Sequence, residues 1–504
     1  MSGLPLLTVL TLVPLAGAVV ALLSRRHARA VALVTALVAL VLALVVWTRL
    51  PADGSIGLTE RAAWAPSLGI EYHLGVDGLG ALMLVLSAVV TLMAVDAAHR
   101  VHHVSLFFGL VLLLEAGLFG SFTALNFFPW FLYWELSLIP AFFLIKLWGG
   151  ARRGPAATQF FIYTMAGSAV LLVAFLGVFL STGSMDFMDL TAMAATGALG
   201  RAVTAHLGAV MPWLAVGVLA GFAVKVPLVP FHTWLPAAYA EAPSPVTMLL
   251  TGAMSKMGVY GLLRIAVPLF GREIAHMRTP LLVLAVITVV MGAWAAAAQK
   301  DLKRVFAYSS VNHLGYCLLG IFALAVPATG AAAQASQAAA LNGVILQMFN
   351  HGITASALFW FVAMMQERTG GERGIDQFGG LRKTAPVLCG MMGIAMFSAL
   401  GLPGLNSFVG EFLIFRGVFP LAWVAATVSL LGLLVTAAVM LTVIQKVFSG
   451  PVAGFSVEFA DLHHRERMAL APVIGLMLLL GLLPQLVLSM VNPTVMNLMA
   501  HWRF

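Results

Sequence analysis

The feature that most constrains this chain is a series of apolar runs, each about twenty residues long, separated by short polar segments. A run of that length matches the hydrocarbon thickness of a bilayer. A chain in lipid must satisfy its backbone hydrogen bonds internally, and a helix does so because each N–H bonds to a carbonyl four residues earlier. The sequence therefore predicts an all-α integral membrane protein.

The composition leaves no room for a separate soluble domain. Of the 504 residues, 61% are hydrophobic and 9% are charged. Segments between apolar runs reach at most about 30 residues, too few to bury a core of their own. At roughly 20 residues per span, the length allows about fourteen transmembrane helices. We expect them near residues 4–23, 30–49, 78–98, 104–123, 126–147, 157–181, 208–226 with a broken continuation to 240, 243–268, 279–298, 305–326, 338–365, 386–418 with an internal break, 420–447 and 469–491.

The distribution of basic residues predicts the orientation. Lysines and arginines favour, by about two to one, the side reached by loops after odd-numbered spans, which places both termini outside. The run near 4–23 has its arginines behind it, so we expect an uncleaved first helix and not a signal peptide. Arg264, Arg272 and Arg278 contradict the charge rule. The net charge is +8, but the basic residues lie at the ends of the predicted helices. This position indicates contact with anionic lipid and not binding of nucleic acid.

Two predicted helices are interrupted. Lys225 is followed by Pro227, Pro230 and Pro236, and each proline removes a backbone donor, so span seven should break partway across the bilayer. In span twelve, SALGLPGLNSFVGEFLIF, glycines and a proline precede Glu411. Each break falls in the fourth helix of a five-helix block, which predicts two inverted five-helix repeats with discontinuous helices 7 and 12. The expected divisions are 1–100 (three helices), 101–270 and 271–450 (the repeats), and 451–504 (helix 14 and tail).

Ionisable residues inside apolar runs are costly and usually functional. Here they are Glu115, Glu135, Lys225, Lys256, His313, His351 and Glu411. Any one of them could be a satisfied structural group, but a passive bundle needs no such set. Lys225 is the natural partner of Glu135, and at about 5 Å with an effective dielectric near 20 the pair is worth roughly 3 kcal/mol. The two histidines suit relay positions between charges, although each alone could be a hydrogen-bonded core residue.

Other polar residues are weaker candidates. His232 follows the first break and could lie at a pathway mouth, and Glu241 stands just outside the membrane as a candidate entry site. Lys303 should anchor a helix end, with Asp301 beside it, and Asp77 should be a helix N-cap.

No cofactor motif is visible. Cys317 and Cys389 form no CxxC pattern, and neither His313 nor His351 has a metal-binding partner four residues later. No glycine-rich phosphate-binding loop follows a predicted strand. We therefore expect no metal site, no cofactor and no catalytic residue on this chain. A polytopic enzyme such as a lipid-linked transferase would need a large polar loop with clustered acids, which the sequence does not offer.

Several motifs occur in an order that resembles a known family. They are LYWELSLIP, FAVKVPLVPFHTWLPAAYAEAP, SKMGVYGLLR, DLKRVFAYSSVNHLGY, FNHGITASALF and GLPGLNSFVGEFLI, spread over about residues 70–450. The chain resembles the antiporter-like, proton-pumping membrane subunits of respiratory complex I. Glu411 stands where the L- and N-type members usually have lysine, and no long lateral extension follows the last predicted span. The stretch AVPATGAAAQASQAA looks longer than the family's usual loop.

The resemblance implies a role and partners. It implies a subunit of a proton-translocating NADH:quinone oxidoreductase in a bacterial inner membrane, without a redox centre of its own. NADH, FMN, iron–sulfur clusters and quinone would be held by partner subunits, and the neighbours would be L- and N-type chains and small helical subunits. Glu135 and Lys225 would be the controlling pair, Lys256, His313 and His351 the relay, and Glu411 the terminal site. Related chains also serve sodium/proton antiporters, membrane-bound hydrogenases and ferredoxin-fed complexes, which stay open as alternatives.

Overall fold

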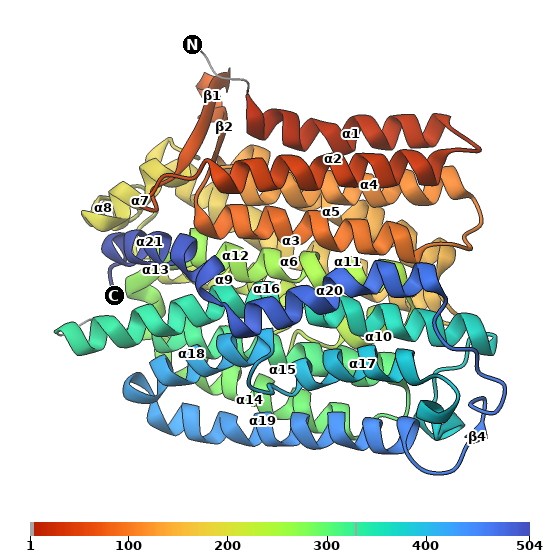
Figure 1. Ribbon diagram of the computed structural model, residues 1–504. Helices are drawn as coiled ribbons and strands as arrows, with labels where there is room; N and C mark the ends of the chain where they lie inside the picture. The colour runs from red at the N-terminus through yellow and green to blue at the C-terminus, as the bar shows by residue number, and fades with distance from the viewer. Residues whose placement is uncertain (1–4, 328–329) are drawn as a thin grey trace.

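The computed structural model describes residues 5–327 and 330–504, and most of them are helical. The long helices run roughly parallel or antiparallel in one bundle, so that their ends gather on two opposite sides (Figure 1). The first six predicted spans are single helices: α1 (Leu6–Leu23), α2 (Ala28–Thr48), α3 (Gly78–Ala97), α4 (Val104–Thr123), α5 (Phe127–Trp148) and α6 (Arg153–Thr182). Residue 4, where the first span was expected to start, lies outside the described residues.

The seventh span is broken, as its prolines predict. Helix α9 (Met211–Lys225) ends at the lysine, a non-helical bend follows, and α10 (Trp234–Glu241) resumes the path. The eighth span is continuous but irregular. It comprises α11 (Ser244–Leu249), α12 (Lys256–Gly261) and α13 (Val267–His276), joined by the π-helical segments Leu250–Met254 and Leu262–Ala266.

The second half of the bundle contains α14 (Arg278–Ala297), α15 (Leu302–Ala323), α16 (Ala331–Thr369), α17 (Pro386–Ala399), α18 (Asn406–Leu421) and α19 (Trp423–Val443). The chain breaks between α17 and α18, as predicted for span twelve. Helix α16 starts seven residues earlier than expected, because the alanine-rich stretch read as a long loop is a good helix former. Residues 328–329 of that stretch lie outside the described residues.

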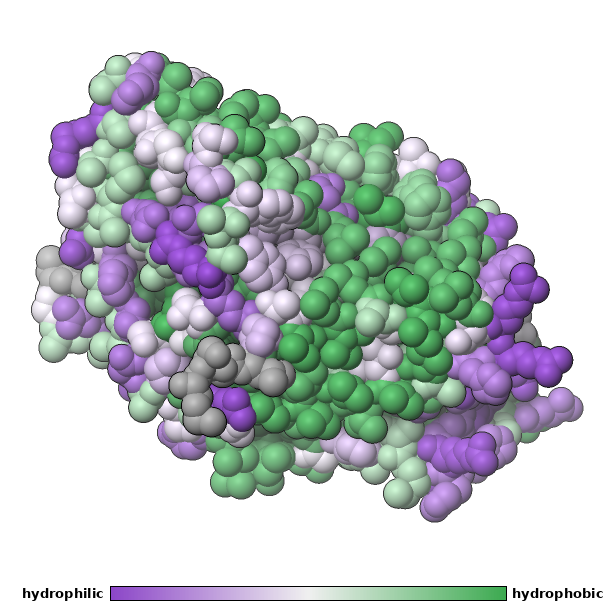
Figure 2. Space-filling model, turned by 90° about the horizontal axis from the view of Figure 1, so that it is seen from above, coloured by the Kyte–Doolittle hydropathy of each residue, from purple (hydrophilic) through white to green (hydrophobic). Residues whose placement is uncertain are grey.

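The last predicted span, 469–491, is not one helix. Helix α20 (His464–Leu482) and α21 (Gln485–His501) meet at a bend of 64° next to Pro484. Among the described residues, 11 helices are long and apolar enough to cross a membrane, or up to 13 if each of two bent pairs counts as one span. The count of fourteen therefore stays a prediction. Figure 2 shows a broad hydrophobic area between hydrophilic ends, as a lipid-facing surface requires.

Short strands are present that an all-α prediction missed. Strands β1 (Gly57–Ala65) and β2 (Ile70–Val76) form an antiparallel hairpin, and β3 (Phe378–Gly379) pairs with β4 (Ala453–Gly454). The hairpin, α7 (Phe187–Ala195), α8 (Ala198–Leu207) and α21 lie at one end of the bundle, here called the hairpin end (Figure 1). The opposite end, here called the basic end, carries β4 and, through the pairing of Asp301 with Gly374, the loops around Lys300 and Arg373.

Two of the arginines that contradict the charge rule have structural roles. Arg264 forms a buried ion pair with Asp77, with 2.5 Å between the guanidinium and the carboxylate. Asp77 also caps α3 by accepting the Gly80 N–H, as predicted. Arg278 donates to the Leu421 carbonyl at 2.7 Å, at the turn between α18 and α19. Arg264 therefore ties the eighth span to the start of α3, and Arg278 ties the start of α14 to the end of α18.

Candidate functional site

Lys225 lies at the point where the first broken span stops being helical. It is the last residue of α9 and only 3% exposed. The break frees backbone carbonyls, and the Trp234 indole N–H satisfies that of Val224 at 2.9 Å. The ammonium lies 4.6 Å from the ring centroid of Trp134 on α5, a cation–π contact. The lysine is therefore held on an aromatic face and not on a carboxylate.

Glu135 follows Trp134 directly on α5 but does not pair with the lysine. In the described part of the chain no ion pair joins Glu135 to Lys225, and one buried carboxylate oxygen, Oε1, has no hydrogen-bond partner. The carboxylate is still near enough for its charge to act on the ammonium. Glu135 is thus a charged neighbour of Lys225, and the direct contact of the ammonium is with the Trp134 ring.

Lys256 is fully buried between the two π-helical segments of the eighth span. Single π turns are frequent at functional sites because they change which groups face the interior. The ammonium has three acceptors: the Thr251 carbonyl at 2.5 Å, the Ser255 hydroxyl at 3.3 Å and Nδ1 of His351 at 2.7 Å. Its three N–H donors are therefore all accounted for.

The two lysines lie on helices in direct contact. A Cβ added to Gly258, two residues after Lys256, would lie 3.1 Å from the Cβ of Lys225. Only a residue without a side chain lets α9 and α12 approach this closely. The first amine is thereby brought next to the helix that carries the second.

Three further groups continue the line from Lys256. The rings of His351 on α16 and His313 on α15 have centroids 5.2 Å apart, and Nδ1 of His313 lies 3.1 Å from Oε1 of Glu411 on α18. Gln347, one turn before His351, places its amide nitrogen 3.3 Å from the same Glu411 oxygen and 3.4 Å from His313 Nδ1. Lys256, His351, His313 and Glu411 thus form one buried cluster built from four helices, here called the central cluster.

The second helix break shapes the end of the central cluster. Gly401 has φ +79°, and a Cβ there would lie 2.6 Å from the Glu411 carboxylate, so both backbone and space require glycine. Glu411 itself is 3% exposed. A buried carboxylate therefore lies next to the break between α17 and α18, as a buried lysine lies at the break after α9.

The weaker candidates lie apart from the central cluster. Glu241 is near Arg152 and Arg373 at the basic end, at 3.9 and 3.8 Å. Lys303 donates to the Ala242 carbonyl, next to Glu241. Asp301 pairs at 2.6 Å with Arg373, not with its neighbour Lys303. These residues form a polar group at the basic end, here called the basic-end cluster.

His232 and Glu115 are isolated. His232 lies in the bend after α9, half-buried, with its Nδ1 unpartnered among the described residues. Glu115 on α4 is completely buried, and neither of its oxygens has a hydrogen-bond partner in the described chain, although Thr91 on α3 is close. The structure does not bring either residue into the central cluster.

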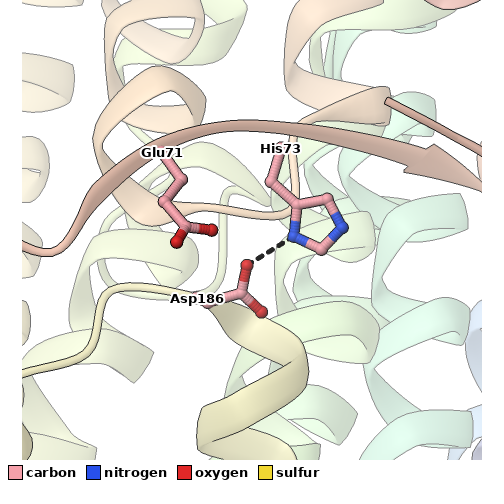
Figure 3. A group of neighbouring side chains, drawn as sticks. All are labelled: Glu71, His73 and Asp186. Atoms are coloured by element: carbon pink, nitrogen blue, oxygen red, sulfur yellow. Dashed lines mark hydrogen bonds and ion pairs between the residues drawn. The ribbon is translucent and has the colours of Figure 1, made fainter. Parts of the chain in front are cut away.

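A second group of titratable side chains lies at the hairpin end (Figure 3). Glu71 and His73 project from one face of β2 toward Asp186, which precedes α7, and their ligand atoms lie within 4.8 Å of one another. Imidazole and carboxylates suit zinc, but His73 donates to Asp186 at 2.5 Å and Arg61 pairs with Glu71 at 2.6 Å. Burial alone would raise the pKa of Asp186, but the His73 bond lowers it below its usual range. The group ties the hairpin to α7.

Several polar side chains around the central cluster were not predicted from the sequence. Gln347 was overlooked, although it lies about one helical turn from His351 on the same face of α16. Thr251 and the hydroxyls of Thr354, Ser398 and Ser407 are also buried there. Small hydroxyl residues are common in membrane helices, so composition alone does not single them out. The signal was their position, one or two turns from a predicted relay residue.

Comparisons with known proteins decide the family. The model of the family described as NADH:quinone oxidoreductase/Mrp antiporter, transmembrane, matches residues 124–439. The chain belongs to this family.

Curated members of the NADH:quinone oxidoreductase/Mrp antiporter family cover almost the whole chain. A Mycobacterium tuberculosis (strain CDC 1551 / Oshkosh) protein named NADH-quinone oxidoreductase subunit M is 33% identical over 541 residues, covering 99% of this chain and 95% of the relative. A Rhodobacter capsulatus protein of the same name is 34% identical, covering 99% and 97%. The family resemblance inferred from the motifs is therefore confirmed.

Solved structures of family members agree in fold. A chain of respiratory complex I from Thermus thermophilus with bound NADH has a TM-score of 0.85 and 28% identity, covering 99% of this chain and 100% of that one. A chain of the Mrp complex from Dietzia sp. DQ12-45-1b has a TM-score of 0.83 at 23% identity, which shows the shared fold alone. The helical membrane fold predicted from the sequence is confirmed.

Proposed function

We propose that this chain is the proton-translocating subunit M of an NADH-quinone oxidoreductase, and that protons move along Glu135, Lys225, Lys256, His351, His313 and Glu411. The observation that carries the proposal is the central cluster, in which an amine, two imidazoles and a carboxylate meet inside the bundle at hydrogen-bond or ring-contact distance. Buried ionisable residues in a membrane are costly. A chain of them in contact suits proton transfer.

The geometry supports a separate role for each residue. Lys256 donates to His351 Nδ1, and His313 Nδ1 faces the Glu411 carboxylate, so a proton leaving the lysine can end on the glutamate. Lys225 sits on the Trp134 face with Glu135 nearby, so a change in the charge of Glu135 changes how strongly Lys225 holds its proton. Glu135 and Lys225 therefore suit loading and control, and Glu411 suits release.

The remaining features of the proposal rest on the family resemblance. Electron transfer would occur on partner subunits that hold NADH, FMN, iron–sulfur clusters and quinone, with no redox centre and no catalytic residue on this chain. The neighbours would be L- and N-type antiporter-like chains and small helical subunits in a bacterial inner membrane, with both termini outside. The two broken spans, one seating Lys225 and the other Glu411, support two inverted five-helix repeats, 101–270 and 271–450.

Substitution of the lysine at the first break tests the proposal. Lys225→Ala should abolish proton pumping by the assembled complex in vesicles that carry a pH dye and are supplied with an electron donor. Lys146→Ala is the matched control, because Lys146 is exposed at the end of α5. Full pumping by Lys225→Ala at normal assembly would refute the proposal. Sodium-dependent exchange without a donor would instead indicate an antiporter subunit.

A further inference from the structure

An apolar groove of about 420 Å³ lies on the outside of the bundle, between α14 and α19. Its walls come from residues 279–287 of α14 and residues 422–428 at the start of α19. Thr279 is the one polar side chain that lines it. Val283 and Trp423, one from each wall, are 52% and 67% exposed. A groove of this composition on a membrane-spanning bundle suits hydrocarbon.

The groove is a wedge that opens at the hairpin end. A Cβ added to Gly432 on α19 would lie 2.5 Å from Val289 on α14, so the two helices touch there. All the lining residues lie between this contact and the starts of both helices, over about 12 Å of α14. A single hydrocarbon chain can enter such a wedge. Another helix, about 10–12 Å across, is too wide to enter between two helices in contact.

Arg278 lies at the open end of the groove. It is the first residue of α14 and immediately precedes Thr279 in the first wall. Its Nη2 donates to the carbonyl of Leu421 at 2.7 Å, and Leu421 immediately precedes the second wall. The guanidinium is therefore held between the two walls, where the groove meets the membrane surface.

The Arg278 guanidinium has no counter-charge in the described part of the chain. None of the ion pairs among those residues includes it, and its hydrogen bonds come from Nη2 alone, to two backbone carbonyls. Helix α14 starts at the same residue without a side-chain cap. An arginine at the positive end of a helix dipole favours an anion, and its fork of donors suits phosphate.

We propose that this groove binds one anionic phospholipid, with its phosphate on Arg278 and one acyl chain between α14 and α19. The charge and the apolar wedge are adjacent, and a phospholipid joins the same two chemistries in one molecule. Trp423 at the mouth is consistent with this depth, because exposed tryptophans gather at the level of the headgroups. The site does not depend on the proposed proton route. It adds a membrane lipid as a ligand of this chain.

The experiment measures lipid binding to the assembled complex in nanodiscs of phosphatidylcholine. Rising fractions of phosphatidylglycerol with a photoreactive acyl chain are added, and cross-linked peptides of α14 and α19 are counted by mass spectrometry. In Arg278→Gln, the amide can still donate to Leu421, but the charge is lost. The phosphatidylglycerol fraction at half-maximal cross-linking should rise about tenfold, the effect of losing a hydrogen bond between charged groups. Arg272→Gln, at an exposed arginine of α13 outside the groove, should leave it unchanged.

A second pair of variants tests the acyl chain. Ala425 lines the groove, so Ala425→Phe should fill it and abolish cross-linking of the two peptides. Thr427→Phe is the matched control, because Thr427 is exposed on the same helix but lies outside the groove. This pair decides the proposal if Arg278→Gln does not assemble.

A density map of the wild-type complex in phosphatidylglycerol nanodiscs gives the direct view. It should show a phosphate about 2.7–2.9 Å from an Arg278 nitrogen and a chain in the groove. A partner helix over the groove, or a groove without lipid, would overturn the proposal. Equal half-maximal fractions for Arg278→Gln and Arg272→Gln would also overturn it, as would equal cross-linking by Ala425→Phe and Thr427→Phe. Photoreactive phosphatidylcholine that labels the peptides as well as phosphatidylglycerol does would refute an anionic headgroup site.

Discussion

Gly410→Ala should disable the central cluster without unfolding the protein. Gly410 is on α18 where it packs against α16, and a Cβ there would lie 3.0 Å from the Gln347 nitrogen, 3.1 Å from its Cα and 2.7 Å from its side-chain oxygen. Ordinary carbon contacts need about 3.5 Å, so α18 must move away by roughly half an ångström. The Gln347 to Glu411 hydrogen bond is already 3.3 Å long and would then exceed hydrogen-bonding distance.

Gly410→Ala should weaken the Gln347–Glu411 hydrogen bond more than it weakens the fold. Overpacking should destabilise the fold by about 1–3 kcal/mol. Replacing a glycine inside a helix with alanine stabilises that helix by nearly 1 kcal/mol, so the complex should still assemble. Losing a hydrogen bond to a charged carboxylate costs about 1.5–3 kcal/mol, which lowers the population of the competent arrangement tenfold or more.

The assay is donor-driven acidification of vesicles containing the purified complex, with electron transfer measured in parallel. Gly390→Ala on α17 is the control, because a Cβ there meets nothing within 4 Å. We expect pumping to fall at least about tenfold in Gly410→Ala and to stay at the wild-type level in Gly390→Ala. Equal pumping by both variants, at equal assembly, would refute the view that the spacing of α16 and α18 sets the Glu411 contact.

Three other predictions follow from individual contacts. Asp77→Asn leaves Arg264 buried without its charge partner and should destabilise the protein by about 3–5 kcal/mol, measured as a lower thermal transition of the complex. Gln347→Leu should lower pumping about tenfold at normal assembly, because it removes the amide donor to Glu411, and vesicle acidification measures this. The loop before α20 should loosen at low pH. Burial would raise the pKa of Asp461, but N–H bonds from the start of α17 hold it below 3.8. Its contribution is therefore present above pH 3.8 and lost as the pH falls through the lowered pKa. Amide exchange at the start of α17 should accelerate there, and Asp461→Asn should remove this pH dependence.

The sequence predicted the helices and their interruptions well because the bilayer imposes strong rules. Three closely spaced prolines follow Lys225, and glycines and a proline precede Glu411, so both discontinuities were predictable from the sequence. The cap at Asp77 was predicted for a similar local reason. The same rules failed where the chain leaves lipid. Strand β2, IEYHLGV, does alternate apolar with polar residues, a strand signal that was overlooked between two long apolar runs. Pro484 was likewise read as part of one long apolar run, although it lies just after the end of α20.

The candidate site was predicted in its residue types but not in its contacts. Costly charges in apolar runs identified Lys256, His351, His313 and Glu411, because burial cost depends on the residue alone. Contacts depend on how helices pack, so the sequence suggested Glu135 as the neighbour of Lys225 but did not predict that the lysine lies on the Trp134 ring. Gln347 and the hydroxyls around the central cluster were missed for the same reason.

The most direct test of the account is the number of protons pumped per electron pair by a complex that carries Lys256→Met. Methionine keeps the length and apolar stem of lysine, so the packing of the two π-helical segments should persist while the amine is lost. The account predicts a lower proton-to-electron ratio at unchanged assembly, because the link from Lys225 to His351 is missing. An unchanged ratio would contradict the claim that the buried cluster conducts protons.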